Sequence, residues 1–277
     1  MTVGHEITIN DGMAVWINHN SNETKESTSY TSYGVVVNFY GTANRGDIED
    51  FVFYVNGKNK ETVNAPVFNI KDATINSPLS RGIFAAGYAV WNIDNTVIES
   101  KKAAIEIRAG ELNIVGGTFT ATADEFSCKA NGNGETTVGA AIAVAQHNTK
   151  LPINVTISGG TFSGYHALSV MNPQKNEYDA IKEIEVNVTE GTLNSTKEGV
   201  EDVNYSSEFI RIGEGSSFTI RARNDGDEGN VTSLPDGRFF SSLQGAVDGV
   251  KDGSTVSLTL LNDVYEDEEL KDKVYAM

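Results

Sequence analysis

The sequence predicts an all-β fold of stacked coils of short strands, with a small helix-bearing unit near the C-terminal end. The chain has 277 residues, with 27 Gly and only 5 Pro. Asn, Thr and Ser are also abundant, and these residues favour turns over helix interiors. Short segments with alternating apolar residues recur every ~20–30 residues, which is the pattern of a β-solenoid. A helical period appears only in the last fifty residues.

Five ten-residue segments align without gaps. They are FNIKDATINS (68–77), WNIDNTVIES (91–100), LNIVGGTFTA (112–121), VTISGGTFSG (155–164) and VNVTEGTLNS (186–195). Position 1 is large and apolar, position 3 is Ile or Val, and position 8 is apolar again, with small or polar residues at positions 4 to 6. Each segment therefore predicts a strand, a tight corner and a second short strand. On this alignment Phe162 is expected to stack between Phe119 and Leu193.

A second set of alternating segments predicts strands for another face of each coil. It comprises AAIEI (103–107), AAIAV (140–144), HALSV (166–170) and EFIRI (208–212). The intervening residues 122–139 and 171–183 are expected to be loops that protrude from the coils, because insertions in repeat folds map to corners. Strand-like segments before residue 65 are either the first coils or a cap that covers the end of the core.

The last part of the chain predicts a strand, a helix and a strand over residues 237–264. Ser241 or Ser242 can cap the helix. The helix is expected to bury one stripe and the strand to alternate. The helical stripe is Leu243, Ala246, Val247 and Val250, and the alternating strand residues are Val256, Leu258 and Leu260. The predicted division is therefore 1–65 for the cap or first coils, 66–223 for the coils, and 224–277 for the strand-helix-strand unit.

Two sequence motifs resemble segments of a known group of proteins. The run FSSLQGAV, followed by DGSTVSLTLLNDV, resembles the helix-bearing start of β-helix modules in large bacterial cell-surface proteins, and ISGGTFSG is similar to their coils. The resemblance covers residues 65–265 and implies a right-handed parallel β-helix, the pectate-lyase-like architecture. It also implies an extracellular or cell-surface location. Residues 224–277 would then be a cap or the opening of a further module in a longer multi-module chain.

Composition limits the classes of partner. The formal net charge is −17, which disfavours nucleic acids and anionic membranes. No run approaches eighteen apolar residues, so no transmembrane helix is expected. The single cysteine, Cys128, excludes an intrachain disulfide framework. The first residues show neither a basic nor an apolar signal-peptide region, so either export does not use that route or a signal has been removed.

One outward column of the alignment contains the polar residues at position 2. These are Asn69, Asn92, Asn113, Thr156 and Asn187. Stacked amides can hydrogen-bond along the coils, and the same groups could instead present donors and acceptors to a carbohydrate. The other outward columns are those at position 4 and along the second strand. Neither these columns nor the one at position 2 places acidic residues on two adjacent coils. The pairs Lys71–Asp94 and Glu106–Arg108 are predicted to be solvated ion pairs.

These features predict a non-enzymatic, adhesin-like interaction protein that binds a glycan or a host or cell-surface protein through its loops. Phe126 and Tyr178 are the candidate exposed aromatic residues of those loops, although each could simply pin its own loop. One alternative is a polysaccharide lyase or hydrolase with carboxylates contributed by loops. The other is a structural protein of a virus or phage tail. No cofactor is expected.

Two further motifs are weaker. Asp225, Asp227 and Glu228 lie in a glycine-rich stretch that could bind Ca²⁺ or serve as an acidic linker. Arg45-Gly46-Asp47 is an integrin-type tripeptide. The four histidines show no metal-ligand spacing, and His166 is expected at a surface corner.

Overall fold

The computed structural model describes residues 2–3, 7–9, 15–18, 36–45, 52–56, 65–130, 137–148, 150–177, 183–197, 205–251 and 254–261. The chain divides into two compact units, and each is described by itself. The first consists of residues 1–204 with 212–219, and the second of 205–211 with 220–277. Over the described residues the fold is all-β with parallel sheets and one short helix, so the predicted fold class is confirmed at this level.

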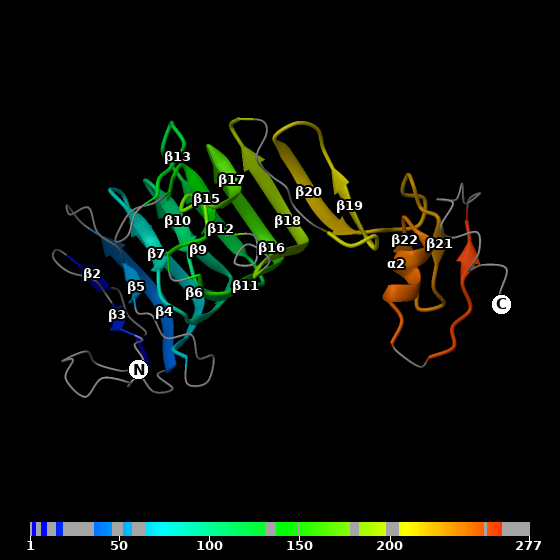
Figure 1. Ribbon diagram of the computed structural model, residues 1–277, viewed down its shortest axis with the longest axis horizontal. Coiled ribbons are helices and arrows are strands. Elements are labelled where there is room, and N and C mark those ends of the chain that lie inside the picture. The colour runs from blue at the N-terminus through cyan, green and yellow to red at the C-terminus, as the bar shows by residue number, and fades with distance from the viewer. Residues whose placement is uncertain are drawn as a thin grey trace. The chain divides into compact units, whose positions relative to one another are not determined.

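The larger sheet has twelve described strands (Figure 1). They are β1 (Thr2–Val3), β2 (Ile7–Ile9), β4 (Val36–Arg45), β6 (Val67–Ser77), β8 (Val90–Asp94), β9 (Thr96–Ser100), β11 (Gly110–Ile114), β12 (Gly117–Ala121), β16 (Ile153–Gly164), β18 (Ile184–Ser195), β19 (Phe209–Ile212) and β20 (Ser217–Ala222). One path through the sheet runs β1-β4-β6-β8-β11-β16-β18-β20-β19, and β9 and β12 pair alongside it. Parallel pairing extends from β1 to β18.

The second sheet has six described strands, in the order β17-β15-β10-β7-β5-β3. They are β3 (Val15–Asn18), β5 (Phe53–Asn56), β7 (Arg81–Ala85), β10 (Ala103–Ile107), β15 (Ala140–Ala145) and β17 (His166–Met171). The chain alternates between the two sheets, since β6, β8 and β11 belong to the larger sheet while β7 and β10 belong to the smaller one. The strands before residue 65 continue both sheets, because β4 pairs with β6 and β5 pairs with β7.

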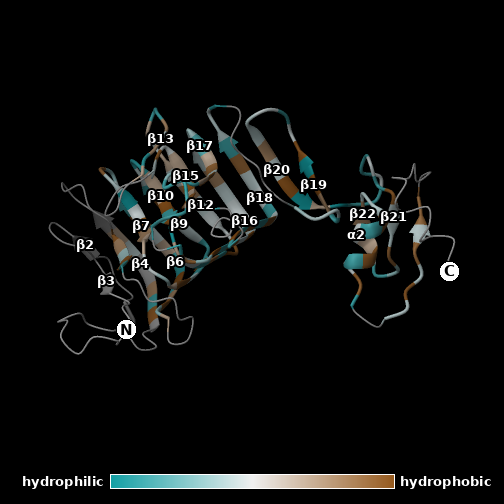
Figure 2. Cartoon of the chain, viewed as in Figure 1, coloured by the Kyte–Doolittle hydropathy of each residue, from teal (hydrophilic) through white to brown (hydrophobic). Residues whose placement is uncertain are grey.

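The aligned segments pair with one another in register. Position 1 stacks Phe68, Trp91, Leu112, Val155 and Val186, and position 8 stacks Ile75, Ile98, Phe119, Phe162 and Leu193. The rings of Phe119 and Phe162 lie 5.0 Å apart and nearly parallel, as expected. Figure 2 shows apolar and polar residues alternating along the strands of the larger sheet. The core therefore comes from one face of each strand, as the two-residue period dictates.

The segment EFIRI does not join the second sheet. Its strand β19 lies beside β20 at the end of the larger sheet. Only residues 213–216 connect these two strands, a link too short for parallel neighbours, so the pair is a hairpin and the larger sheet is mixed. The segment alternates like its relatives, and the connection length, rather than the alternation, decides its partner.

The second unit contains a three-stranded antiparallel sheet in the order β22-β21-β23 and the helix α2. Its elements are β21 (Thr232–Ser233), β22 (Phe239–Phe240), α2 (Leu243–Asp248) and β23 (Thr259–Leu260). Ser242 caps the helix by accepting a hydrogen bond from the Gly245 amide, as predicted.

A small core in this unit unites Leu234, Phe240 and Ala246. Two details of the prediction are wrong. Val247 is 52% exposed, and the described strand is only two residues long, with Leu260 60% exposed. A six-residue helix buries only a narrow stripe, so Val247 remains in solvent while Val250 packs against the small core.

Candidate functional site

A groove of about 610 Å³ lies at the carboxyl ends of three neighbouring strands of the larger sheet, within the first unit. It is lined by three equivalent segments, 120–124, 163–165 and 194–196, together with Ser217. These segments end β12, β16 and β18, which are neighbouring strands in register. The same position in three successive passages of the chain therefore contributes to one polar groove.

Main-chain hydrogen bonds hold these segments in a stack. The Thr122 amide donates to the Ser100 carbonyl over 2.9 Å, and the Thr196 amide donates to the Gly164 carbonyl over 3.0 Å. Gly164 is required here because a Cβ atom would lie 2.8 Å from the His166 carbonyl oxygen. The Ser195 hydroxyl accepts from the Ala167 amide over 2.8 Å. Main-chain hydrogen bonds, together with the Ser195 hydroxyl, thus fix the path of the segments that line the groove.

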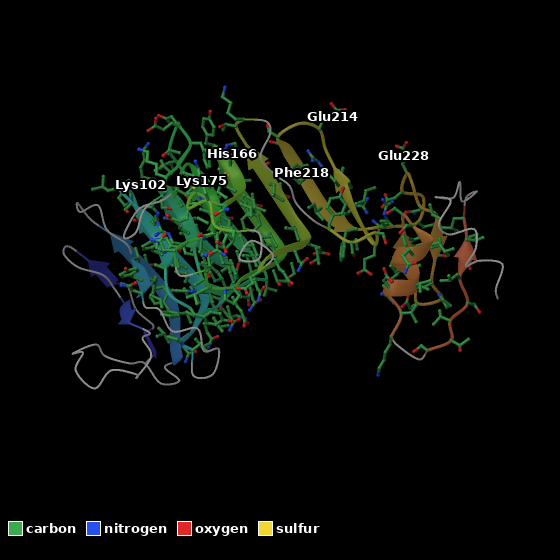
Figure 3. The ribbon with its side chains drawn as sticks, viewed as in Figure 1. Lys102, His166, Lys175, Glu214, Phe218 and Glu228 are labelled. Atoms are coloured by element: carbon green, nitrogen blue, oxygen red, sulfur yellow. The ribbon has the colours of Figure 1, made fainter. Side chains whose placement is uncertain are left out.

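Tyr165 provides the aromatic side chain of the groove. It is half-buried, and its ring centroid lies 5.1 Å from that of His166, nearly perpendicular to it. His166, at the start of β17 (labelled in Figure 3), is buried and also meets Phe126 edge-on at 4.5 Å. The expectation that His166 is a surface corner residue is therefore wrong. The rings of His166 and Phe126 therefore hold the Tyr165 ring in place.

Phe126 is half-buried, because its ring packs against the small-residue cluster Ala103, Ala140 and Ala143 of the second sheet. The expectation of an exposed aromatic is therefore not met, and Phe126 pins its own loop, the alternative that the sequence left open. The loop continues into an antiparallel pair, β13 (Ser127–Cys128) and β14 (Thr137–Val138). Tyr178, the other aromatic candidate, lies outside the described residues.

A buried ion cluster anchors this hairpin to the second sheet. Glu106 accepts hydrogen bonds from Arg108 Nε and Nη2 over 3.0 and 2.9 Å, and from Arg81 Nε. Arg81 Nη2 also donates to the Thr137 carbonyl of β14. Exposed fractions of 0–1% for the three ionic side chains show that Glu106–Arg108 is not a solvated pair, so that prediction is wrong.

The outward face of the second sheet is buried around this cluster because aromatic rings lie on it. The Phe84 ring centroid is 4.6 Å from the Arg108 guanidinium carbon, and the Tyr54 ring stacks on Phe84 at 5.3 Å. Burial lowers the pKa of Arg108, opposed by the adjacent Glu106 carboxylate. Burial also raises the pKa of the Cys128 thiol nearby, which favours its neutral form.

The position-2 column forms the amide ladder that the sequence predicts. Asn69, Asn92 and Asn113 each donate to the preceding rung, over 2.9, 2.9 and 3.0 Å, and the first acceptor is Asn38, which the alignment had not included. Thr156 and Asn187 continue the column in register and are exposed. Because the amides satisfy one another, this column stabilises the stack. Its role in binding a ligand stays a prediction.

The predicted ion pair between Lys71 and Asp94, on neighbouring strands of the larger sheet, is solvated, as expected. Lys71 Nζ lies 2.7 Å from Asp94 Oδ2, with side chains 64% and 40% exposed.

The acidic stretch near residue 225 is organised by arginine. Asp227 accepts from Arg221 Nη1 and Nη2 over 2.7 and 2.8 Å, and from the Asn224 amide over 2.7 Å. These bonds lower the pKa of Asp227 to about 2. Asp225 and Glu228 (Figure 3) are exposed and do not share this arrangement. Asp227 therefore holds its own loop, and binding of Ca²⁺ stays a prediction.

Three further expectations concern a metal site, a membrane-spanning helix and the tripeptide Arg45-Gly46-Asp47. Over the described part of the chain, no group of three or more His, Cys, Asp or Glu side chains is placed to hold a metal ion. Among the same residues, no helix has the length and apolar character needed to span a bilayer. Arg45 ends β4, and Gly46 and Asp47 lie outside the described residues.

The groove residues were missed although the alignment contained their signal. Positions 7 and 9 flank the buried position 8 and point outward. Position 7 gives the threonine row, Thr74, Val97, Thr118, Thr161 and Thr192, and position 9 gives the mixed row, Asn76, Glu99, Thr120, Ser163 and Asn194. The mixed row leads into the groove. Tyr165 and Asp124 follow the repeat and have no counterpart in it, so alignment alone does not indicate them.

Comparisons of the chain with family models, with curated proteins and with solved structures returned no match.

Proposed function

We propose that the first unit is a right-handed parallel β-helix and that the protein is a non-enzymatic extracellular or cell-surface protein that binds a neutral glycan in the groove. The observation that carries this proposal is that three successive strands bring hydroxyl and amide groups to one groove with Tyr165 in its lining. The parallel register of the aligned segments supports the β-helix. The resemblance to bacterial surface proteins supports the location.

The groove has the chemistry that a sugar requires. Thr120, Ser163 and Asn194 each both donate and accept hydrogen bonds, as sugar hydroxyls do. Tyr165 adds an apolar ring face with a polar tip, which suits a surface that is apolar on one side and wet on the other. Asp124 supplies an acceptor. No Lys or Arg is among the described lining residues, and the nearby Lys101 ammonium donates to the Thr122 carbonyl over 3.2 Å.

The same residues favour binding over cleavage. Hydrolysis of a glycosidic bond by the common mechanism takes two carboxyl groups that flank the bond. Among the described residues that line the groove, Asp124 is the one carboxylate. This supports a binding protein over the lyase or hydrolase alternative.

The test is binding of the purified chain to a glycan array, followed by calorimetric titration of the glycans that bind. Tyr165→Ala is expected to weaken binding about 10-fold or more, because aromatic anchors contribute much of the free energy at binding sites. Tyr205→Ala is the matched control, since Tyr205 is 41% exposed and lies in the second unit. Equal affinity of Tyr165→Ala and the wild type would refute the site.

The enzyme alternative is tested with the same glycans. Incubation with and without Ca²⁺ is expected to leave them intact. Chain shortening that Asp124→Asn abolishes would establish catalysis and overturn the proposed binding role.

A further inference from the structure

The groove is one end of a longer polar surface. The threonine row and the mixed row together form what we name the polar track, which runs across β6, β9, β12, β16 and β18. Each side chain of the track is partly or fully exposed, while the position-8 residues between them are buried. The track is therefore an outward surface of the sheet with the core directly beneath it.

The geometry of the track follows from the strand spacing. Neighbouring strands lie ~4.8 Å apart, so the four steps from β6 to β18 span about 19 Å, perpendicular to the strands. Thr42 of β4 pairs with Thr74 and continues the threonine row past β6. The rows repeat the same two positions at each strand because the pairing is in register. Beyond the last step, Thr192 Oγ1 lies 3.0 Å from Thr219 Oγ1, which extends the hydroxyl row to β20. The polar side chains of the track therefore repeat along the direction in which the strands stack.

We propose that the ligand is an extended, linear, neutral polysaccharide that lies along the polar track, with one part of the chain seated in the groove. This rests on the proposed glycan binding. A polymer with repeating hydroxyl groups matches a surface with repeating hydroxyl and amide groups, and the exposed apolar Val97 accommodates the less polar faces of the sugar rings. A polyanion would meet Glu99 in the track and Asp124 in the groove, on a chain with net charge −17.

The consequence is a dependence of affinity on chain length. Once one segment is bound in the groove, contacts further along the track form within the complex and pay little further association entropy. A net hydrogen bond contributes about 0.5–1.5 kcal/mol, so each strand engaged is expected to raise the affinity about 2–10-fold. The gain should stop when the oligosaccharide spans the track.

The experiment is calorimetric titration with cello-, xylo- and manno-oligosaccharides from disaccharide to octasaccharide, and with oligogalacturonates as the acidic series. In at least one neutral series the affinity is expected to rise with length and then level off, and the acidic series is expected to bind more weakly at every length. Thr74→Val keeps the shape of the side chain and removes its hydroxyl on β6, a strand of the track that does not line the groove. This variant is expected to lower the affinity for the longest oligosaccharide that binds about 2–10-fold. Its affinity for the disaccharide is expected to equal that of the wild type.

Thr255→Val is the matched control, because Thr255 is an exposed threonine of the second unit and belongs to neither the polar track nor the amide-ladder column. Its affinities should equal those of the wild type. Affinity independent of length, tighter binding of the acidic series, or an unchanged Thr74→Val would overturn the track while leaving binding in the groove intact. Absence of binding by any sugar at any length would overturn the proposed function as well.

Discussion

Replacing Glu106 by glutamine removes one negative charge from the interior of the first unit and keeps the shape of the side chain. In the wild type this carboxylate accepts hydrogen bonds from two guanidinium groups, Arg81 and Arg108, and all three side chains are 0–1% exposed. Glutamine would leave two buried positive charges without their shared counter-charge. Breaking a buried ion pair in this way costs about 3–5 kcal/mol.

This cost translates into a large shift of the thermal midpoint. For a unit of 150–250 residues, 1 kcal/mol moves the midpoint by about 2–4 °C, so Glu106→Gln is expected to lower it by roughly 6–20 °C. Urea unfolding followed by tryptophan fluorescence measures the same change, because Trp91 is fully buried in this unit. Glu185→Gln, at an exposed position on β18, is the control and should change the stability by no more than about 0.5 kcal/mol.

The hairpin gives a second readout. The Thr137 carbonyl accepts from Arg81, and the Thr137 amide lies 3.4 Å from a Glu106 carboxylate oxygen. Hydrogen exchange of residues 127–128 and 137–138 should therefore become faster in Glu106→Gln than in the control. A variant that unfolds within about 0.5 kcal/mol of the wild type would show that the cluster is hydrated or otherwise compensated. It would refute the assignment of the ion cluster as the anchor of the hairpin.

Three further predictions follow from individual contacts. Gly117→Ala should destabilise the first unit by at least about 2 kcal/mol, because Gly117 has φ +128° and a Cβ would lie 2.2 Å from a carbonyl oxygen. Gly116→Ala, with nothing within 4 Å, is its control, and equal urea midpoints for the two variants would contradict the reasoning. Asn92→Ala should cost about 1–2 kcal/mol by removing two ladder bonds, measured by urea unfolding; a loss below about 0.3 kcal/mol would mean that water replaces the ladder. Burial and the nearby Glu111 raise the pKa of Tyr88 from 10.0 to about 12, so the folded state holds this proton more tightly. Stability should be unaffected by this group below pH 10 and should fall as the pH rises from 10 to about 12, and Tyr88→Phe should lack that part of the fall in urea midpoint.

The groove shows why the site was harder to predict than the fold. Thr120, Ser163 and Asn194 occupy one position of the alignment, so their meeting on one surface could be inferred from the sequence. Tyr165 could not be placed in the same way, because its position depends on His166 and Phe126, which come from outside the aligned segments. Contacts between a repeat and an insertion have no periodicity to reveal them.

The sequence by itself determined the all-β class, the in-register stacking of the aligned segments and the amide ladder. Each of these depends on local alternation and on the same residue recurring at the same position. Only the tertiary structure decided that Glu106 and Arg108 are buried, because alternation says which side of a strand a residue faces but not what covers that side. A loop from the same chain and the aromatic side chains Tyr54 and Phe84 lie against the outward face of the second sheet, where solvent was expected. The polar track stays exposed by the same reasoning, since the described residues place no such cover over it.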